Sequence, residues 1–231
     1  MNTLKINNKI YILRHGESME DLNKDNYKYF EDNEIPLTNL GIEQALEVGD
    51  IIKSEETSDE VIFYISPSRR VVETTNKIVS RLGSQVNTKI KILKEIRKQD
   101  WGKVLTEDRS KIEKDRYEVG VLRYSFPNGE KSESYLNRFK YFVECIKKEV
   151  ETTPNVTRII ITHGFELRLI LMNIFNWDEL YFESLEHPKN CEIKRITVKI
   201  EKNKNAIFNL EDEMKIYDKN SNSNFISRRI N

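Results

Sequence analysis

Short runs of apolar residues along the chain predict the strands of a buried sheet. Three of them, at 9–14, 60–66 and 158–162, are rich in β-branched or aromatic residues and are too short to be buried helices. Two further segments, 89–93 and 196–201, alternate apolar and polar residues, as strands with one exposed face do. The pattern therefore predicts five strands.

Between these strands the apolar residues recur every three or four positions, which is typical of amphipathic helices. The first such segment, 38–54, starts at Thr38, a residue that favours a helix N-cap. Three more helices are predicted at 68–83, 132–150 and 165–177. Because strands and helices alternate, the sequence predicts an α/β fold, a three-layer α/β/α sandwich with a mainly parallel central sheet.

The length of 231 residues suits one large domain. No internal repeat and no Gly/Pro/Ser-rich linker interrupts the alternation of elements, so we expect a single domain over residues 1–215. Residues 216–231 are polar and rich in Asn and Ser, and we expect them to form a mobile C-terminal tail.

Composition narrows the possible partners. Lys plus Arg equals Asp plus Glu, 38 each, which argues against binding nucleic acid through bulk charge. No apolar run approaches the ~20 residues needed to span a bilayer, and no secretory signal is visible. The two cysteines form no CxxC pair, so neither a disulfide scaffold nor a thiolate zinc site is expected. We expect a cytoplasmic protein without membrane or nucleic-acid partners; the oligomeric state stays open.

The ends of the three strongest strands share an unusual chemistry. The first ends in Arg14 and His15, the second leads into the basic segment 66–70, and the third ends in His163. Both of these histidines are followed by a glycine, and they are two of the three histidines in the chain. Because ligands of open α/β sheets bind beyond the carboxyl ends of the strands, these residues are expected to converge on one site.

Such a site could bind either a metal cation or an oxyanion. Two histidines can ligate zinc, but the neighbouring arginines would repel a cation and no further ligand motif is present. Arginine instead favours an oxyanion, above all phosphate, which a guanidinium binds with two parallel hydrogen bonds. Since no nucleotide-binding glycine loop is present, the pattern favours phosphoryl transfer with a histidine as the nucleophile.

The motifs in this order resemble those of the histidine phosphatase superfamily, in the branch that contains cofactor-dependent phosphoglycerate mutases. Its RHGE, LTxxGxxQA, SPLxRAxxT and second histidine motifs are matched by residues 14–17, 37–45, 66–74 and 162–164. The resemblance covers roughly residues 9–200. It implies a phosphoglycerate mutase-like fold, no metal and no cofactor, and a phosphorylated small molecule or phosphoprotein as substrate.

The resemblance also implies roles for individual residues. His15 would attack the phosphoryl group and carry it as phosphohistidine, which water would hydrolyse. Arg14 and Arg70 would bind the phosphate oxygens, and His163 would donate to them in the transition state.

The chain departs from the family at the acid that protonates the leaving group. Lys98 occupies the position where the family usually has glutamate, and lysine is a poor acid near neutral pH. Glu95 is the substitute that we predict, with Asp100 as a weaker candidate. A second departure is Asp21, where the family often has asparagine; its carboxylate would have to point away from phosphate or pair with Lys24.

These observations favour a histidine acid phosphatase-like phosphomonoesterase that hydrolyses phosphate monoesters through phosphohistidine. A phosphoglycerate mutase is the second candidate within the family. The third, from another class, is a catalytically weakened protein that binds a phosphorylated ligand, because Lys98 replaces the acid.

Overall fold

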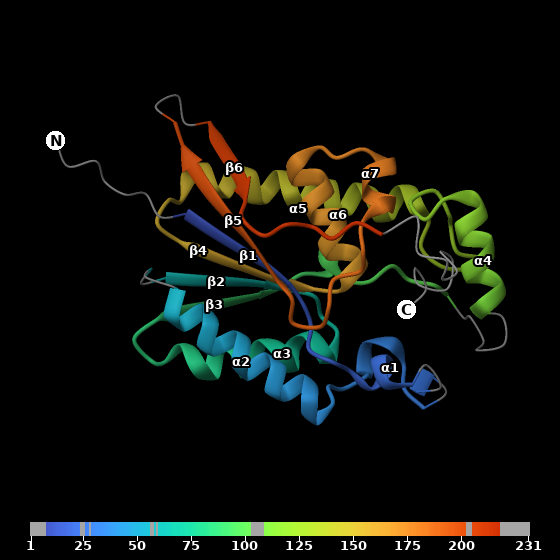
Figure 1. The fold of residues 1–231 in the computed structure, drawn as a ribbon, viewed down its shortest axis with the longest axis horizontal. Helices are drawn as coiled ribbons and strands as arrows, with labels where there is room; N and C mark the ends of the chain where they lie inside the picture. Colours follow the sequence, from blue (N-terminus) through green and yellow to red (C-terminus); the bar gives the residue numbers. More distant parts are fainter. Residues whose placement is uncertain are drawn as a thin grey trace.

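The fold is built around one mixed sheet. A computed structural model describes residues 8–217 apart from 24–25, 28, 56–57, 59, 103–108 and 202–204. Over these residues six strands pair in the order β3-β2-β4-β1-β5-β6 (Figure 1). The strands are β1 (Asn8–Arg14), β2 (Glu60–Ile65), β3 (Asn87–Ile92), β4 (Thr157–Thr162), β5 (Ile193–Ile200) and β6 (Ala206–Leu210).

The register brings the ends of the parallel strands together. β4 lies between β1 and β2 and is parallel to both, and β3 is parallel to β2. Arg14, the last residue of β1, lies opposite Thr162, the last residue of β4. β5 runs antiparallel to β1 and β6 antiparallel to β5. The prediction of a mainly parallel sheet is confirmed.

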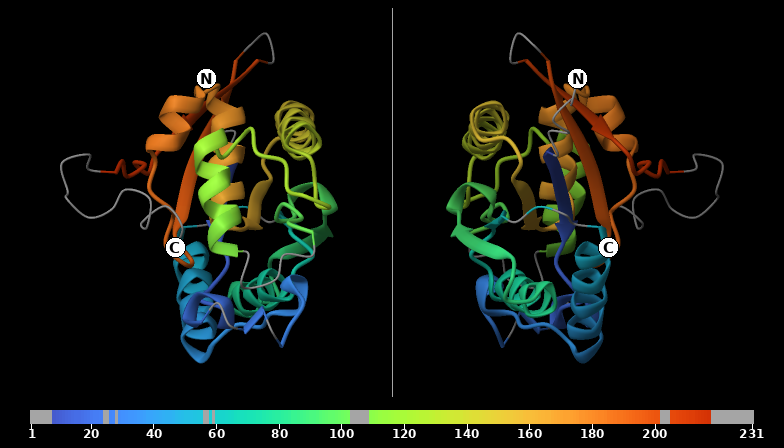
Figure 2. Two further views of the ribbon diagram at one scale, coloured as in Figure 1. Left: turned by 90° about the vertical axis from the view of Figure 1, so that its right-hand side faces the viewer. Right: turned by 90° about the vertical axis from the view of Figure 1, so that its left-hand side faces the viewer.

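Helices cover both faces of this sheet. α2 and α3 lie on one face, and α5 and α6 lie on the other, as the side views show (Figure 2). This confirms the predicted three-layer sandwich. The helices are α1 (Met19–Leu22), α2 (Asn39–Glu55), α3 (Arg69–Leu82), α4 (Arg109–Val119), α5 (Ser132–Thr152), α6 (Gly164–Phe175) and α7 (Glu179–Ser184), with 3-10 turns η2 (Asp32–Glu34) and η3 (Lys94–Ile96).

Two hydrophobic cores result from the alternation of side chains along the central strands. In β1, Ile10 and Ile12 belong to the core beneath α5 and α6, whereas Tyr11 and Leu13 belong to the core beneath α2 and α3. A strand buried on both faces reads as a continuous apolar run. That is why the central strands were visible in the sequence.

The structure adds elements that the sequence did not predict. α4 is dominated by charged residues, so its helical period of apolar residues is weak, and β6 is a short edge strand of alternating burial.

At the C-terminal end, Ile216 pairs with Leu185 and the backbone N–H of Tyr217 donates to the carbonyl oxygen of Ser184 at 2.9 Å. Residues 218–231 of the predicted tail lie outside the described residues. Within the described chain, no helix combines the length and the apolar character that crossing a bilayer requires.

Candidate active site

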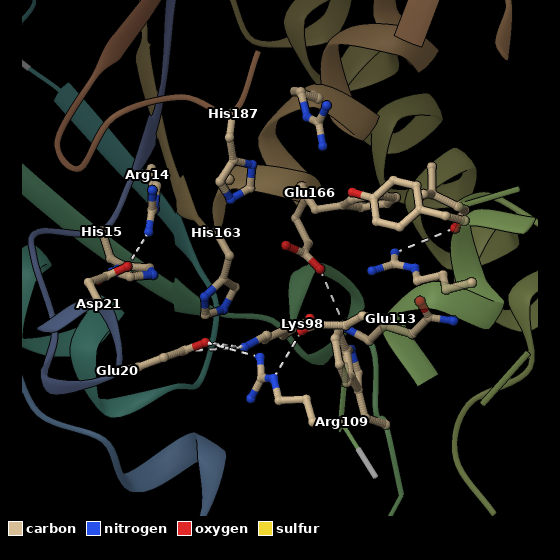
Figure 3. A pocket seen from close by; sticks show the side chains of 18 of the residues that line it. Arg14, His15, Glu20, Asp21, Lys98, Arg109, Glu113, His163, Glu166 and His187 are labelled. Atoms are coloured by element: carbon tan, nitrogen blue, oxygen red, sulfur yellow. Dashed lines mark hydrogen bonds and ion pairs between the residues drawn. The ribbon is translucent and has the colours of Figure 1, made fainter. Parts of the chain in front are cut away.

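The carboxyl ends of β1, β2 and β4 meet at one edge of the sheet (Figure 1). Residues at this edge line a pocket. Four of the five predicted site residues line it: Arg14, His15, Arg70 and His163. Figure 3 labels the first two and His163. Glu95, the predicted acid, does not line it. Strand ends that are far apart in the sequence thus deliver two histidines and two arginines to one place.

His15 is fixed by the backbone of its neighbours. Its N–H donates to the carbonyl oxygen of Thr162 at 3.0 Å, which extends the pairing of β1 and β4 by one residue. The N–H of Cys191, just before β5, donates to the carbonyl oxygens of Arg14 and His15 at 3.1 and 3.2 Å. The strand beyond Leu13 is therefore held on both sides at the point where it enters the pocket.

The motif residues of α2 and α3 hold the segment immediately after His15. The N–H of Gly16 donates to Oγ1 of Thr74 at 3.0 Å, and the N–H of Glu17 donates to Oε1 of Gln44 at 2.9 Å. The Glu17 carboxylate accepts from Oγ1 of Thr38 at 2.8 Å. Glu17 thus connects the loop to the start of α2. Motifs that are separate in the sequence are joined here by hydrogen bonds.

His15 is buried and its tautomer is set by one contact. Its Nδ1 lies 2.8 Å from the carbonyl oxygen of Gly16. A carbonyl oxygen only accepts, so Nδ1 carries the hydrogen and, in the neutral ring, Nε2 keeps its lone pair. Burial, together with the charges of Arg70 and Arg14, lowers the pKa of His15 from 6.5 to about 3. The ring is therefore neutral near pH 7, with its lone pair on Nε2.

We expect the His15 imidazole to remain uncharged from about pH 7.5 down to about pH 5, because its pKa is held low by burial and two arginines. The check is a titration of the imidazole nitrogen chemical shifts in protein labelled with ¹⁵N-histidine, assigned by the loss of signals in His15→Ala. A protonation midpoint near 6.5, the ordinary value, would contradict this description.

Asp21 is the partner of Arg14. The Arg14 guanidinium pairs with Oδ1 of Asp21 and donates to the carbonyl oxygen of Pro188 at 3.0 Å. Oδ2 of Asp21 accepts from the backbone and hydroxyl of Ser18 at 2.9 and 2.8 Å and from Asn190 at 3.1 Å. Burial favours the neutral acid, but Arg14 and His15 outweigh it and lower the pKa of Asp21. The carboxylate thus positions the arginine; Lys24, the other partner considered, lies outside the described residues.

Arg70, the first-turn arginine of α3, is fully buried and held by acidic residues. It donates to the backbone and carboxylate of Asp32, with the carboxylate oxygens at 3.3 and 3.4 Å, and lies 3.7 Å from Oε2 of Glu20. The preceding Arg69 instead pairs with Glu73 on the surface.

His163 is the N-cap residue of α6 and faces His15. The two ring centroids lie 5.2 Å apart at an interplanar angle of 70°. Nε2 of His163 lies 3.0 Å from the hydroxyl of Ser66, at the end of β2, and its Nδ1 has no partner among the described residues. Burial, followed by the charges of Arg70 and His15, lowers the pKa of His163 well below its ordinary value.

Several side chains of the pocket wall have a buried nitrogen atom without a hydrogen-bond partner among the described residues. Beside His15 these are Nε of Arg14, Nε of Arg70 and Nδ1 of His163, and Nε of Arg116 lies further across the pocket. Buried donors without partners are rare and costly in folded proteins. Their concentration beside His15 indicates a place for an acceptor-rich anion.

Lys98 is held in its protonated, positively charged form. Its ammonium donates to both carboxylate oxygens of Glu20, at 3.1 and 3.3 Å, to Asp32 at 2.9 Å and to the hydroxyl of Tyr27 at 2.8 Å. Burial alone would lower the pKa of Lys98, but Asp32 and Glu20 outweigh it and raise the pKa. Lys98 is therefore a structural cation that neutralises the two carboxylates beside Arg70, and it is unsuited to donate a proton.

Replacing Lys98 with methionine is expected to lower the free energy of unfolding by about 2 kcal/mol, because Glu20 and Asp32 would lose their shared cation in a largely buried setting. Urea unfolding followed by circular dichroism measures the change. Lys94→Met, at a lysine four residues earlier that lies outside this network, is the matched control. Equal midpoints for the two variants would show that the Lys98 network adds no stability.

Glu95 and Asp100 lie away from the reacting groups. Glu95 belongs to η3 and does not line the pocket; its backbone oxygen accepts from Arg138. Asp100 is exposed, and its carboxylate accepts from the N–H of Gly102 at 2.8 Å. The structure brings neither carboxyl group to His15.

Other pocket residues were not singled out by the sequence. His187 lies against Gly164: a β-carbon there would come within 2.5 Å of the His187 ring. Glu166 is buried three residues after His163. Two features of the sequence could have pointed to them. His187 is the third histidine of the chain, and Glu166 lies one turn into a helix that starts at His163. Across the pocket, Arg116 of α4 lies over the rings of Phe165 and Trp101.

Over the described residues, no group of three or more His, Cys, Asp or Glu side chains could hold a metal ion. The cations in the pocket wall are Arg14, Arg70, Lys98, Arg109, Arg116 and Arg168. This arrangement suits an anion.

A sheet of this topology, with paired histidines and arginines at its carboxyl edge, defines a class of phosphoryl-transfer protein. The chain belongs to the histidine phosphatase superfamily (branch 1), whose profile matches residues 10–211. The resemblance found in the motifs is thereby confirmed.

Individual proteins resemble this chain in sequence or in fold. The chain is 30% identical to the phosphoglycerate mutase-like protein AT74 of Arabidopsis thaliana, over 80% of this chain and 63% of that protein, and so spans less than two thirds of its length. It is 22% identical to the broad-range acid phosphatase DET1 of Saccharomyces cerevisiae, over 80% of this chain and 83% of that one. Among solved structures, the alpha-ribazole phosphatase of Shigella flexneri matches with a TM-score of 0.65 and 19% identity, over 92% of this chain and all (100%) of that one.

Proposed function

We propose that this protein hydrolyses phosphate monoesters through a phosphohistidine formed on Nε2 of His15. The observation that carries the proposal is the set of three unpartnered buried nitrogens, on Arg14, Arg70 and His163, that surrounds a neutral histidine. A phosphoryl group can accept hydrogen bonds from all three. The matches to proteins described as phosphatases support this reaction class.

In the first step the Nε2 lone pair attacks phosphorus, and the bond to the leaving oxygen breaks. Arg14 and Arg70 bind the non-bridging oxygens, and their charges stabilise the transition state. The hydroxyl of Ser66 can donate to Nε2 of His163, which leaves the hydrogen on Nδ1 to bind a phosphoryl oxygen. In the second step water attacks phosphorus, the nitrogen–phosphorus bond breaks, and Nε2 regains its lone pair.

A weakly catalytic protein that binds a phosphorylated ligand is the second candidate. It is favoured by the acidic partners that the cations already have: Asp21 on Arg14, Asp32 on Arg70 and Glu20 on Lys98. These carboxylates reduce the positive charge available to a phosphate dianion. A phosphoglycerate mutase remains a third possibility, and no contact in the described part of the pocket favours it.

Turnover and trapping together test the proposal. Purified protein is mixed with p-nitrophenyl phosphate, and release of p-nitrophenol is followed. A parallel sample is denatured in alkali during turnover and analysed by mass spectrometry for a phosphoryl group on His15, since phosphohistidine survives base and is lost in acid. Steady turnover with a phosphoryl group on His15 supports the phosphatase. Tight binding of inorganic phosphate without turnover would favour the binding protein, and a phosphoryl group on another residue would contradict both.

A further inference from the structure

The pocket contains a buried carboxyl group that has no role in the two steps of the proposed reaction. Glu166 lies in the first turn of α6 and is 2% exposed. Its side chain lines the pocket beside His163 and His187, on the side of His163 opposite to His15 in the view of Figure 3. One oxygen, Oε1, accepts from the hydroxyl of Tyr135 at 2.7 Å and from the N–H of Gln99 at 3.4 Å. These donors fix the group while its second oxygen makes no hydrogen bond to a described residue.

Glu166 differs in its partners from three other carboxyl groups of the pocket wall. Glu20 is bound by Lys98, Asp21 by Arg14, and Glu113 by Arg109 at 3.0 Å. A carboxylate in contact with a cation is held in its ionised form and is a poor proton donor. In the described part of the chain, Glu166 has no cationic nitrogen within ion-pair distance and both of its donors are uncharged, while the charge of Arg116 acts on it from across the pocket.

Phosphoryl transfer from an alkyl ester needs a proton for the departing oxygen. The leaving alkoxide is strongly basic, so a positioned acid accelerates its departure by about 10²- to 10⁴-fold. Lys98 does not meet this need, because its ammonium donates to Glu20, Asp32 and Tyr27. Glu166 offers the same pocket a carboxyl group one helical turn from His163, held by the hydroxyl of Tyr135.

We propose that Glu166 is the general acid and base of the reaction, an inference that rests on the proposed phosphatase function. As Nε2 of His15 bonds to phosphorus, the carboxyl proton of Glu166 passes to the leaving oxygen and the alcohol departs. The resulting carboxylate then takes a proton from the attacking water, whose oxygen bonds to phosphorus as the nitrogen–phosphorus bond breaks. Inorganic phosphate leaves, and Glu166 is protonated again.

The test compares two leaving groups in Glu166→Gln, which keeps the shape of the side chain and removes the acid. The substrates are p-nitrophenyl phosphate, whose leaving phenolate is stable, and glycerol 2-phosphate, whose leaving alkoxide is not. We expect kcat/KM for glycerol 2-phosphate to fall about 10²-fold or more, and kcat/KM for p-nitrophenyl phosphate to fall less than about threefold. Phosphohistidine should accumulate in the variant, because water is no longer activated.

Two further variants keep the test decisive. Tyr135→Phe removes the hydroxyl that positions Glu166. Its kcat/KM should fall more for glycerol 2-phosphate than for p-nitrophenyl phosphate, by a smaller factor than in Glu166→Gln. This variant keeps the test valid even if Glu166→Gln folds poorly. Glu95→Gln, outside the pocket, should behave as wild type on both substrates. Equal losses of Glu166→Gln on both substrates, or a leaving-group effect in Glu20→Gln instead, would overturn the inference.

The outcome for His15 separates this inference from the proposed function. If wild-type protein forms phosphohistidine on His15 but Glu166→Gln shows no dependence on leaving group, only the assignment of Glu166 fails. If wild-type protein forms no phosphohistidine and turns over neither ester, the phosphatase function itself fails.

Discussion

His15→Ala lowers kcat/KM for p-nitrophenyl phosphate at least about 10³-fold, because the variant has no atom that can bond to phosphorus at this place. The arginines and His163 remain, so binding of inorganic phosphate should change much less than turnover. Steady-state kinetics and isothermal titration calorimetry with phosphate measure the two effects. The variant therefore separates the chemical role of His15 from its contribution to the charge of the pocket.

The control for this prediction is chemical rescue. Free imidazole added to His15→Ala can enter the space left by the ring and accept the phosphoryl group, so part of the lost rate should return as imidazole is raised. Rescue shows that the loss came from the missing nucleophile and not from a collapsed pocket. Undiminished turnover in His15→Ala without imidazole would remove His15 from the mechanism.

Gly41→Ala is expected to cost about 3 kcal/mol of unfolding free energy, because two backbones meet where a methyl group would be added. A β-carbon on Gly41 would lie 2.0 Å from the carbonyl oxygen of Glu17 and 2.8 Å from its nitrogen. Neither atom can rotate away, so α2 would have to move from the loop that comes after His15. For a chain of this size the melting temperature should fall by about 6–12 °C, measured by calorimetry.

Two other substitutions serve as comparisons for Gly41→Ala. Glu43→Ala, on the exposed side of the same helix, should leave the melting temperature within about 2 °C of wild type. Gly164→Ala meets a movable side chain, the His187 ring at 2.5 Å, so it should be less destabilising than Gly41→Ala. A melting temperature of Gly41→Ala equal to that of Glu43→Ala would mean that α2 and the His15 loop are not locked together.

The sheet and the meeting of Arg14, His15 and His163 at one edge could be predicted because their signals are local, whereas Arg70 was chosen over Arg69 by the resemblance to the family. The central strands are buried on both faces and therefore appear as apolar runs, and parallel strands bring the residues just beyond their carboxyl ends to one edge of the sheet. Arg14, His15 and His163 lie at the ends of such runs, and Arg70 lies one short turn beyond another. The position of Arg14, His15 and His163 at the ends of buried strands was enough to predict that these residues meet in space.

The surroundings of these residues depend on side chains from distant segments, which no local pattern reports. In the sequence, Lys98 was visible only as a departure from the glutamate that the family usually has at this position. Its partners Glu20, Tyr27 and Asp32 come from a segment of largely irregular structure far earlier in the chain. Glu95 was favoured because it is close in sequence to Lys98. The chain turns between them, so that proximity does not place Glu95 in the pocket.

The two walls of the pocket have different attachments. The wall that carries His15 is bonded into the sheet through Thr162 and into α3 through Thr74, whereas the facing wall is supplied largely by Trp101 and by α4, a helix outside both cores. Variation can therefore accumulate in α4 without disturbing the hydrogen bonds that fix His15. On the proposed function, we expect exchanges of α4 residues such as Arg116 to change which phosphate ester is accepted and to leave the two chemical steps as they are.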